Sequence, residues 1–302
     1  MNRILIFSSL CKSKDILELT IPSWIGMEKG NLDVEILLYN DNRDADAFAY
    51  VDSLPEKHSS ITVVDGWFNE ESTYKNHNWT LDQVDRIIHI KNRVLELAQE
   101  NKYDAVFLID ADLVLHPKTL LHLESLKKDF VFEIFWTVFT DQLFAKPNCW
   151  DVHSWSYHNA QSILRLKEAG TYQIGAGGAC TLLSSNAINA GVNFEKINNL
   201  SYGGEDRHIC TRAEVLGFPI FVDTFFPAFH IFEKNLLKNA KDWISLEYSR
   251  EYFDSWLDQS WEDRVIQTHQ KEVPSKPKNE FDRIRKALYK AKRAYINYMR
   301  YN

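Results

Sequence analysis

The first 110 residues alternate short apolar runs with amphipathic segments of helical spacing, and this alternation limits the fold more than any other feature. Four apolar runs have the length and the branched and aromatic content of buried strands, at 3–10, 32–42, 61–66 and 105–109. Apolar residues at helical spacing lie between them, at 13–29 and 80–102. Strands and helices in this order, joined by short links, predict an α/β fold with a mainly parallel sheet flanked by helices.

Several acidic residues fall at the predicted strand ends. In sheets of this kind ligands bind beyond the carboxyl ends of the strands. The aspartates at these ends are Asp41, Asp65, Asp110 and Asp112. We therefore expect a binding site at this edge of the sheet.

The composition is that of a globular protein with a large core. The chain has 302 residues, of which 45% are hydrophobic and 25% charged. Its four cysteines are far apart and form no CxxC pair, so we expect reduced thiols and neither a zinc cluster nor a disulfide framework. No secretory signal is apparent, and no stretch approaches the roughly 20 apolar residues of a spanning helix. These features predict a cytoplasmic protein.

The charge is unevenly distributed along the chain. The net charge is −7, yet residues 271–302 carry ten Lys or Arg against three acids, a net +7 that leaves −14 for the rest. An acidic body argues against nucleic-acid binding. Residues 279–301 have the spacing of a basic amphipathic helix, which could lie on an anionic membrane surface, dock on the acidic body or mediate self-association. We therefore divide the chain into a main domain (1–238), an aromatic-rich helical extension (239–270) and a basic tail helix (271–302).

Asp110 and Asp112 form a DxD pair after the strand at 105–109. On extended backbone the two side chains point the same way, because the strand repeat is two residues. Two carboxylates on one side repel each other unless a cation lies nearby, and oxygen ligands suit Mg²⁺ or Mn²⁺. The alternative is structural, with one aspartate capping the next turn and the other facing water.

A second set of motifs makes the pattern specific. The segment GGEDRHICTRAEVLGFPIFVDTFFPAFHI follows at 203–231, after IKNRVLELA at 90–98 and FLIDADLVLHP at 107–117. In this order the motifs resemble those of GT-A fold glycosyltransferases, similar to the inverting family-2-type enzymes. The resemblance covers roughly residues 2–235. It implies a Rossmann-like GT-A sheet and the transfer of a sugar from a nucleoside-diphosphate donor, with UDP as the expected nucleotide.

The resemblance also implies a metal site. Departure of a nucleoside diphosphate leaves negative charge that a divalent cation, Mn²⁺ or Mg²⁺, can stabilise. Asp112 would coordinate the metal, Asp110 would contact the ribose or a metal-bound water, and His230 would complete the site. The alternative for His230 is a partly buried structural histidine at a strand end.

Asp206 matches the catalytic base of the family. It would accept the proton of the acceptor nucleophile, Glu205 could bind an acceptor hydroxyl, and Gly203 and Gly204 would let the backbone approach the substrate. The competing interpretation is an ordinary helix start, since acids in a first helical turn interact favourably with the helix dipole.

Further residues are candidates for donor binding: Ser8, Asp41, Asp65, Arg93, Gly177 and Gly178. By the resemblance, Asp41 and Asp65 would hold the nucleotide base and ribose, and Arg93 matches a basic residue before the DxD strand. Arg93 could equally be a surface charge of its helix. Gly177 and Gly178 would bring backbone close to the sugar and the diphosphate.

The acceptor and the exact activity stay open at this stage. The aromatic loop 148–159 could form a sugar-stacking platform, a lid or a packing cluster. The acceptor could be a saccharide, a lipid-linked molecule, a small molecule or a protein, because the fold does not choose among them. The alternatives to a glycosyltransferase are a sugar-phosphate nucleotidyltransferase and a non-catalytic sugar- or peptide-binding scaffold.

Overall fold

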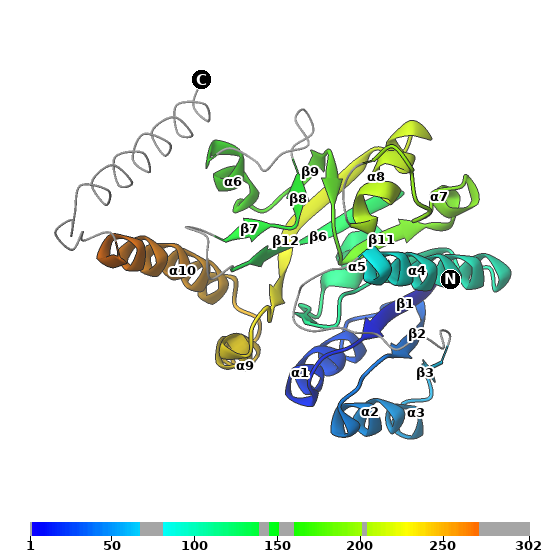
Figure 1. The fold of residues 1–302 in the computed structure, drawn as a ribbon, viewed down its shortest axis with the longest axis horizontal. Coiled ribbons are helices and arrows are strands. Elements are labelled where there is room, and N and C mark those ends of the chain that lie inside the picture. Colours follow the sequence, from blue (N-terminus) through cyan, green and yellow to red (C-terminus); the bar gives the residue numbers. More distant parts are fainter. Residues whose placement is uncertain (1, 67–80, 139–144, 151–159, 201–203, 272–302) are drawn as a thin grey trace, which may run out of the picture.

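A computed structural model describes residues 2–66, 81–138, 145–150, 160–200 and 204–271 (Figure 1). The predicted tail helix at 279–301 lies outside these residues, as do Gly203 and most of the aromatic loop. None of the helices in the described ranges is both long and apolar enough to cross a membrane.

One mixed sheet forms the centre of the fold. Its first four strands are parallel and run in the order β3-β2-β1-β4: β1 (Arg3–Leu10), β2 (Asp33–Asn40), β3 (Ile61–Val64) and β4 (Ala105–Leu108). The sheet continues as β11-β6-β12-β5: β11 (Thr181–Ser184), β6 (Phe130–Thr137), β12 (Ile220–His230) and β5 (Leu113–Val114). The expected α/β class is confirmed. The sheet becomes mixed because β11 is antiparallel to both of its neighbours, β4 and β6.

Short strands complete the structure beside the sheet. β7 (Lys146–Pro147) pairs with β6, β9 (Thr171–Ile174) pairs with β12, and β8 (Cys149–Trp150) pairs with β10 (Ala176–Gly177).

Helices cover both faces of the sheet (Figure 1). They are α1 (Lys14–Ile25), α2 (Ala45–Asp52), α3 (Leu54–Lys57), α4 (Leu81–Glu100), α5 (Thr119–Ser125), α6 (Ala160–Leu166), α7 (Ser185–Asn189), α8 (Glu205–Val215), α9 (Leu237–Ser245) and α10 (Arg250–Lys271), with a 3-10 turn at Lys234–Leu236.

Alternating side chains of β1 supply two separate cores. Ile4 and Ile6 join the apolar cluster on the face covered by α1 and α2, whereas Leu5 and Phe7 join the cluster on the face covered by α4. This follows from the two-residue repeat of a strand, which sends successive side chains to opposite faces. A strand buried on both sides reads as one continuous apolar run, as residues 4–7 do.

Helix α1 is tied to the segment that carries the DxD pair. Thr20 Oγ1, Ser23 Oγ and Trp24 Nε1 form hydrogen bonds of 2.8–3.0 Å with the backbone of residues 111–115. All three side chains are buried, so these bonds are shielded from competing water. The second half of α1 is therefore held in a fixed position relative to the segment that carries Asp112.

The C-terminal helices α9 and α10 pack on the same core as α4. Trp243 and Phe253 are almost fully buried around Phe229 of β12, and Trp256 lies 4.4 Å from Phe229 between ring centroids. Burial of aromatic rings is a large source of stabilisation. Helix α9 and the first two turns of α10 thus extend the hydrophobic core of the sheet.

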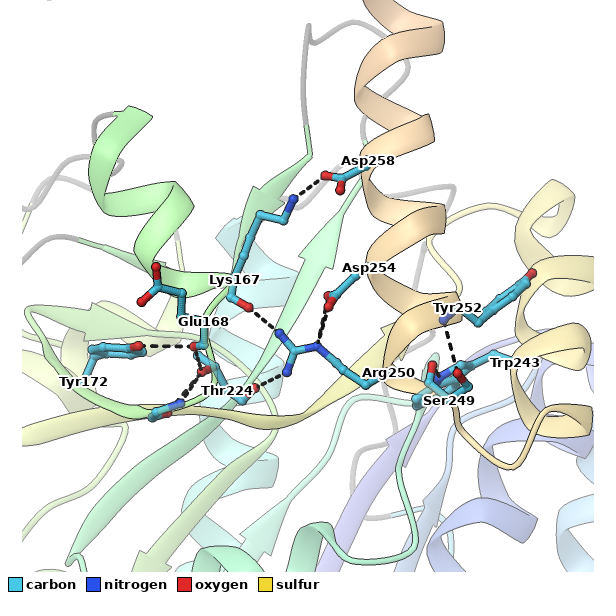
Figure 2. Close-up of polar contacts among 11 residues, drawn as sticks. Lys167, Glu168, Tyr172, Thr224, Trp243, Ser249, Arg250, Tyr252, Asp254 and Asp258 are labelled. Carbon is cyan, nitrogen blue, oxygen red and sulfur yellow. Dashed lines mark hydrogen bonds and ion pairs between the residues drawn. The ribbon is translucent and has the colours of Figure 1, made fainter.

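Polar contacts anchor the first turn of α10 (Figure 2). Arg250 donates hydrogen bonds to the carbonyl oxygens of Thr224 and Lys167 and forms an ion pair with Asp254. Lys167 also pairs with Asp258, one turn further along α10. These contacts fix α10 against the segment between α6 and β9 and against β12.

Candidate active site

A cavity of about 660 Å³ lies at the carboxyl ends of β1, β2 and β4. It is also lined by α4, by the start of α8 and by the end of β12. The predicted site residues that line it are Asp41, Asp110, Asp112, Gly178, Gly204, Glu205, Asp206 and His230. Residues more than 180 positions apart thus face one space.

Asp112 and His230 lie close together on one wall of the cavity. His230 Nε2 is 3.4 Å from Asp112 Oδ2, and His230 Nδ1 lies 3.0 Å from Thr137 Oγ1. The backbone holds the two residues in register, because His230 pairs with Leu113 across β12 and β5. The ammonium of Lys12 contacts the same Asp112 oxygen at 2.6 Å. Although burial opposes it, the neighbouring His230 and Lys12 side chains hold the pKa of Asp112 well below its usual range.

Asp110 is the exposed member of the DxD pair and faces the cavity. Desolvation within the cavity raises the pKa of Asp110, and the neighbouring Asp112 carboxylate raises it further. The charge of Lys91 opposes both effects, but the pKa of Asp110 remains above its usual value. The two aspartates are therefore unequal, since Asp112 is stabilised as an anion and Asp110 is not.

These residues fit a divalent cation that is shared with a substrate. Ligands at about 2.1 Å in an octahedron lie about 3 Å apart, close to the 3.4 Å separation of Asp112 Oδ2 and His230 Nε2. Within the described ranges, no three His, Cys, Asp or Glu side chains form a ready-made metal site. Hard cations at phosphate sites are commonly held by one or two protein ligands together with phosphate oxygens. A carboxylate, an imidazole and a second carboxylate nearby suit Mn²⁺ or Mg²⁺ in that setting.

A buried ionic cluster forms another part of the cavity wall. Lys91 Nζ on α4 lies 2.6 Å from Glu205 Oε1 and 3.8 Å from Asp206 Oδ1, both in the first turn of α8. Burial alone would lower the pKa of Lys91, but the charges of Glu205, Asp206 and Asp110 raise it above its usual value. Lys91 is therefore a permanent cation next to the predicted base.

Asp206 itself has the properties of a proton acceptor. Burial raises its pKa well above the usual range, the charge of Glu205 raises it further, and Lys91 opposes both. Its side chain is 26% exposed, and the residue lines the cavity. A carboxylate with a raised pKa is a stronger base than an ordinary one and suits general base catalysis near neutral pH.

The two candidate glycines have different environments. A Cβ on Gly178 would lie 2.5 Å from Asp206 Oδ2, so only glycine lets the carboxylate approach the chain here. A Cβ on Gly177 would instead lie 2.7 Å from the ring of Phe132. Gly178 lines the cavity, whereas Gly177 packs against the core.

Asp41 has a partner that the sequence did not suggest. Arg86 of α4 donates to both carboxylate oxygens of Asp41, at 2.8 Å and 3.3 Å, and also to Tyr39 Oη at 3.3 Å. The pair lines the cavity at the end of β2. It presents an acceptor and a donor side by side, the combination needed to bind the edge of a nucleotide base.

Besides Gly177, three predicted residues are placed away from this cavity. Ser8 is fully buried, because it shares the face of β1 with Ile4 and Ile6, and Ser9 lines the cavity in its place. Arg93 lies on the exposed side of α4, where it pairs with Glu96 and Glu100. Asp65 is exposed and is not among the lining residues.

Three basic residues that were not predicted also line the cavity: Lys12, Arg86 and Lys91. A signal for Lys91 was present: it falls in the apolar stripe of its helix, between Ile87 and Val94, where a charge must be paired if it is buried. Lys12 and Arg86 carry no comparable signal. Among the aromatic loop residues, Trp150 lines the cavity, and residues 151–159 lie outside the described part.

Similarity to known proteins is found at the level of the structure. No protein-family model matches the sequence, and no curated protein matches it significantly. Among solved structures, "GalNAc-T7 with UDP, GalNAc and Mn²⁺" is similar with a TM-score of 0.52 and 14% identity, over 75% of this chain and 42% of that chain. A mannosyltransferase, PcManGT from Pyrobaculum calidifontis in complex with GDP-Man and Mn²⁺, gives a TM-score of 0.45 and 13% identity over 73% of this chain and 56% of that one. S. aureus TarS gives a TM-score of 0.47 and 11% identity over 76% of this chain and 36% of that one.

The similarity is structural and covers only part of each solved chain. This chain matches between 36% and 56% of their lengths. At identities this low, the match with a TM-score above 0.5 establishes the arrangement of helices and strands. The chain has the GT-A glycosyltransferase fold that its motifs predict.

Proposed function

We propose that this protein is a metal-dependent, inverting glycosyltransferase that moves a sugar from a UDP-linked donor to an acceptor nucleophile. One observation carries the proposal. A single cavity joins Asp112 and His230, which suit a shared cation, to Asp206, a carboxyl with a raised pKa, on the start of α8. A base and a cation-supported leaving group are the two requirements of a single displacement.

In this proposal Asp206 accepts the proton of the acceptor nucleophile. The nucleophile forms a bond to the anomeric carbon while the bond from that carbon to the diphosphate oxygen breaks on the opposite face, which inverts the configuration. Glu205 lines the same wall and accepts a hydrogen bond from an acceptor hydroxyl. Lys91 holds Glu205 in place through their 2.6 Å ion pair.

Donor binding falls to the residues at the strand ends. Asp112 and His230 would hold Mn²⁺ or Mg²⁺, with Asp110 contacting the ribose or a metal-bound water. The cation would supply charge stabilisation to the departing diphosphate. Asp41 and Arg86 would bind the uracil edge, since their paired carboxylate and guanidinium can accept from its N–H and donate to its carbonyl. One solved structure with a similar fold was determined with UDP and Mn²⁺, which supports this assignment.

A donor panel tests the activity. The protein is incubated with UDP- and GDP-linked sugars and Mn²⁺, together with saccharide, lipid-linked, small-molecule and peptide acceptors, and the release of nucleoside diphosphate is measured. We expect UDP release that depends on Mn²⁺. Release of pyrophosphate from a sugar phosphate and UTP would instead indicate a nucleotidyltransferase, and UDP-sugar binding without any turnover would indicate a scaffold.

Asp206→Asn tests the assignment of the base. The amide cannot accept the proton, so we expect turnover to fall at least 10²-fold while UDP affinity in the presence of Mn²⁺ is unchanged. Glu214→Gln, an exposed acid on the same helix, is the matched control and should keep full activity. Full activity in Asp206→Asn would rule out this residue as the base.

A further inference from the structure

Lys12 occupies a position that several buried contacts define. It lies in the link between β1 and α1, where its backbone N–H donates to Asn42 Oδ1 at 3.0 Å. Asn42 is itself fixed by a 2.7 Å hydrogen bond to Asn40 Oδ1, and both asparagines are buried. The Lys12 side chain is only 17% exposed. The end of β2 thus anchors the main chain of this lysine.

The ammonium of Lys12 is directed at one oxygen of Asp112. The Nζ to Oδ2 distance is 2.6 Å, and the Asp112 side chain is 6% exposed. Buried hydrogen bonds from α1 to residues 111–115 fix the two main-chain segments relative to each other. The contact is therefore part of the folded structure and not an incidental surface pair.

The same oxygen faces the imidazole with which Asp112 would bind a cation. Asp112 Oδ2 is the atom that lies 3.4 Å from His230 Nε2. A divalent cation bound between Asp112 and His230 must use this oxygen, and the Lys12 ammonium already neutralises it. Two cations this close repel each other unless further negative charge is added.

We propose that Lys12 is an internal competitor of the divalent cation at Asp112 and makes metal binding depend on the donor. This proposal rests on the metal site of the proposed function. Without the donor, Lys12 neutralises Asp112 and metal binding is weak. A nucleoside diphosphate adds negative charge at the cavity, which compensates both the ammonium and the metal. Metal and donor should therefore bind with positive coupling, and Lys12 should be the source of much of it.

Titration with Mn²⁺ alone tests the competition directly. Free Mn²⁺ is measured by its electron paramagnetic resonance signal in the presence of wild-type protein, Lys12→Met and Lys12→Arg. We expect Lys12→Met to bind Mn²⁺ about tenfold more tightly than wild type, within the usual range of coupling between sites. Lys12→Arg retains the positive charge and should resemble wild type. Equal or weaker Mn²⁺ binding by Lys12→Met would overturn the proposal.

Lys14→Met is the matched control. Lys14 is two residues away, is 46% exposed and lies 3.7 Å from Glu18, so its removal should leave Mn²⁺ affinity unchanged. A similar gain in this variant would show a general charge effect and would also overturn the proposal. Thermal melting confirms that each variant is folded, and Lys12→Gln replaces Lys12→Met if the latter unfolds.

A second titration measures the coupling. Mn²⁺ affinity is determined with and without saturating UDP by calorimetry. We expect UDP to strengthen Mn²⁺ binding in wild type by a larger factor than in Lys12→Met, and equal factors would contradict the inference. Failure of wild type to bind UDP at all would count against the proposed function, while the titration with Mn²⁺ alone would still decide the role of Lys12.

Discussion

The ammonium of Lys91 lies 2.6 Å from Oε1 of Glu205, and this buried ion pair joins α4 to α8 at the wall of the cavity. The Lys91 and Glu205 side chains are 9% and 11% exposed. Lys91 also lies 3.8 Å from Asp206, so one cation supports both acids of the first turn of α8. Under the proposed function, Lys91 therefore links the stability of the fold to the ionisation of the base.

Lys91→Met should strongly destabilise the protein. Removing one partner of a buried ion pair leaves an uncompensated charge, which typically costs about 3–5 kcal/mol. Urea unfolding followed by circular dichroism measures the change. The double variant Lys91→Met/Glu205→Met removes both charges and should recover most of the loss, because a buried pair replaced by apolar groups is often neutral. A double variant no more stable than Lys91→Met would contradict this account.

The pH dependence of turnover should report the ionisation of Asp206. Because burial and Glu205 raise its pKa, the residue stays protonated, and inactive as a base, to a higher pH than an ordinary aspartic acid. We expect kcat to rise with pH along an acidic limb. Since Lys91 lowers this pKa, Lys91→Met should move the limb to higher pH.

A pH profile of kcat at saturating donor and Mn²⁺ checks this shift. Lys196→Met, which removes an exposed charge paired with Asp85, serves as a control and should leave the limb in place. A limb that is identical in Lys91→Met and wild type would show that Lys91 does not act on the base.

Gly178→Ala should impair turnover more than folding. The new methyl group would come within 2.5 Å of Asp206 Oδ2 and push the carboxylate into the cavity. A displacement of about 1 Å in a catalytic group can cost about 10²-fold in rate. Gly177→Ala provides the contrast, since its methyl group meets the ring of Phe132 and should lower stability. Kinetics and thermal melting of both variants separate the two effects, and unchanged kcat in Gly178→Ala would contradict the prediction.

Local sequence patterns were sufficient to predict the sheet edge. β1, β2, β3 and β4 appear in the sequence as apolar runs, because helices bury most of β1, β2 and β4 and the start of β3. The DxD pair follows the last of these strands, so its place at the carboxyl edge required only the strand assignment. The cavity could be anticipated for the same reason.

Long-range side-chain geometry could not be read from the sequence. Ser9, and not Ser8, lines the cavity, since a shift of one residue on a strand reverses the face. Arg86 and Lys91, and not Arg93, contact the site because the rotation of α4 decides which residues of the helix face inward. Lys12 reaches Asp112 because α1 packs on residues 111–115, a contact between segments about 90 residues apart.

Glu133→Gln should be more stable than wild type, by a margin that grows as the pH rises. Glu133 is fully buried on β6, and burial, reinforced by the nearby Asp223 charge, raises its pKa well above the usual value. The folded state favours the protonated form of Glu133. Its contribution to the free energy of unfolding is therefore complete below the pKa of the unfolded chain, about 4.3, and is lost as the pH rises toward the raised pKa of the folded state. Each pH unit between the two pKa values costs about 1.4 kcal/mol.

Melting temperatures between pH 5 and 9 check this prediction. Glutamine remains neutral throughout, so the advantage of Glu133→Gln over wild type should grow with pH. Glu214→Gln, which changes an exposed acid on α8, should show no such trend. An advantage that is constant with pH would argue against a neutral Glu133.

Arg250→Met should loosen α10 from the sheet (Figure 2). The change removes the hydrogen bonds to the carbonyl oxygens of Thr224 and Lys167 as well as the ion pair with Asp254. Hydrogen bonds to charged groups contribute about 1.5–3 kcal/mol each, and the methionine restores only the packing of the side-chain stem, so we expect a loss of about 2–4 kcal/mol. Urea unfolding measures this loss, and limited proteolysis should show earlier cleavage within α10.

Lys238→Met is the control, because its pair with Asp242 is exposed and such pairs contribute little to stability. Equal stability of the two variants would mean that the aromatic contacts of Trp243, Phe253 and Trp256 hold the C-terminal helices without the help of Arg250.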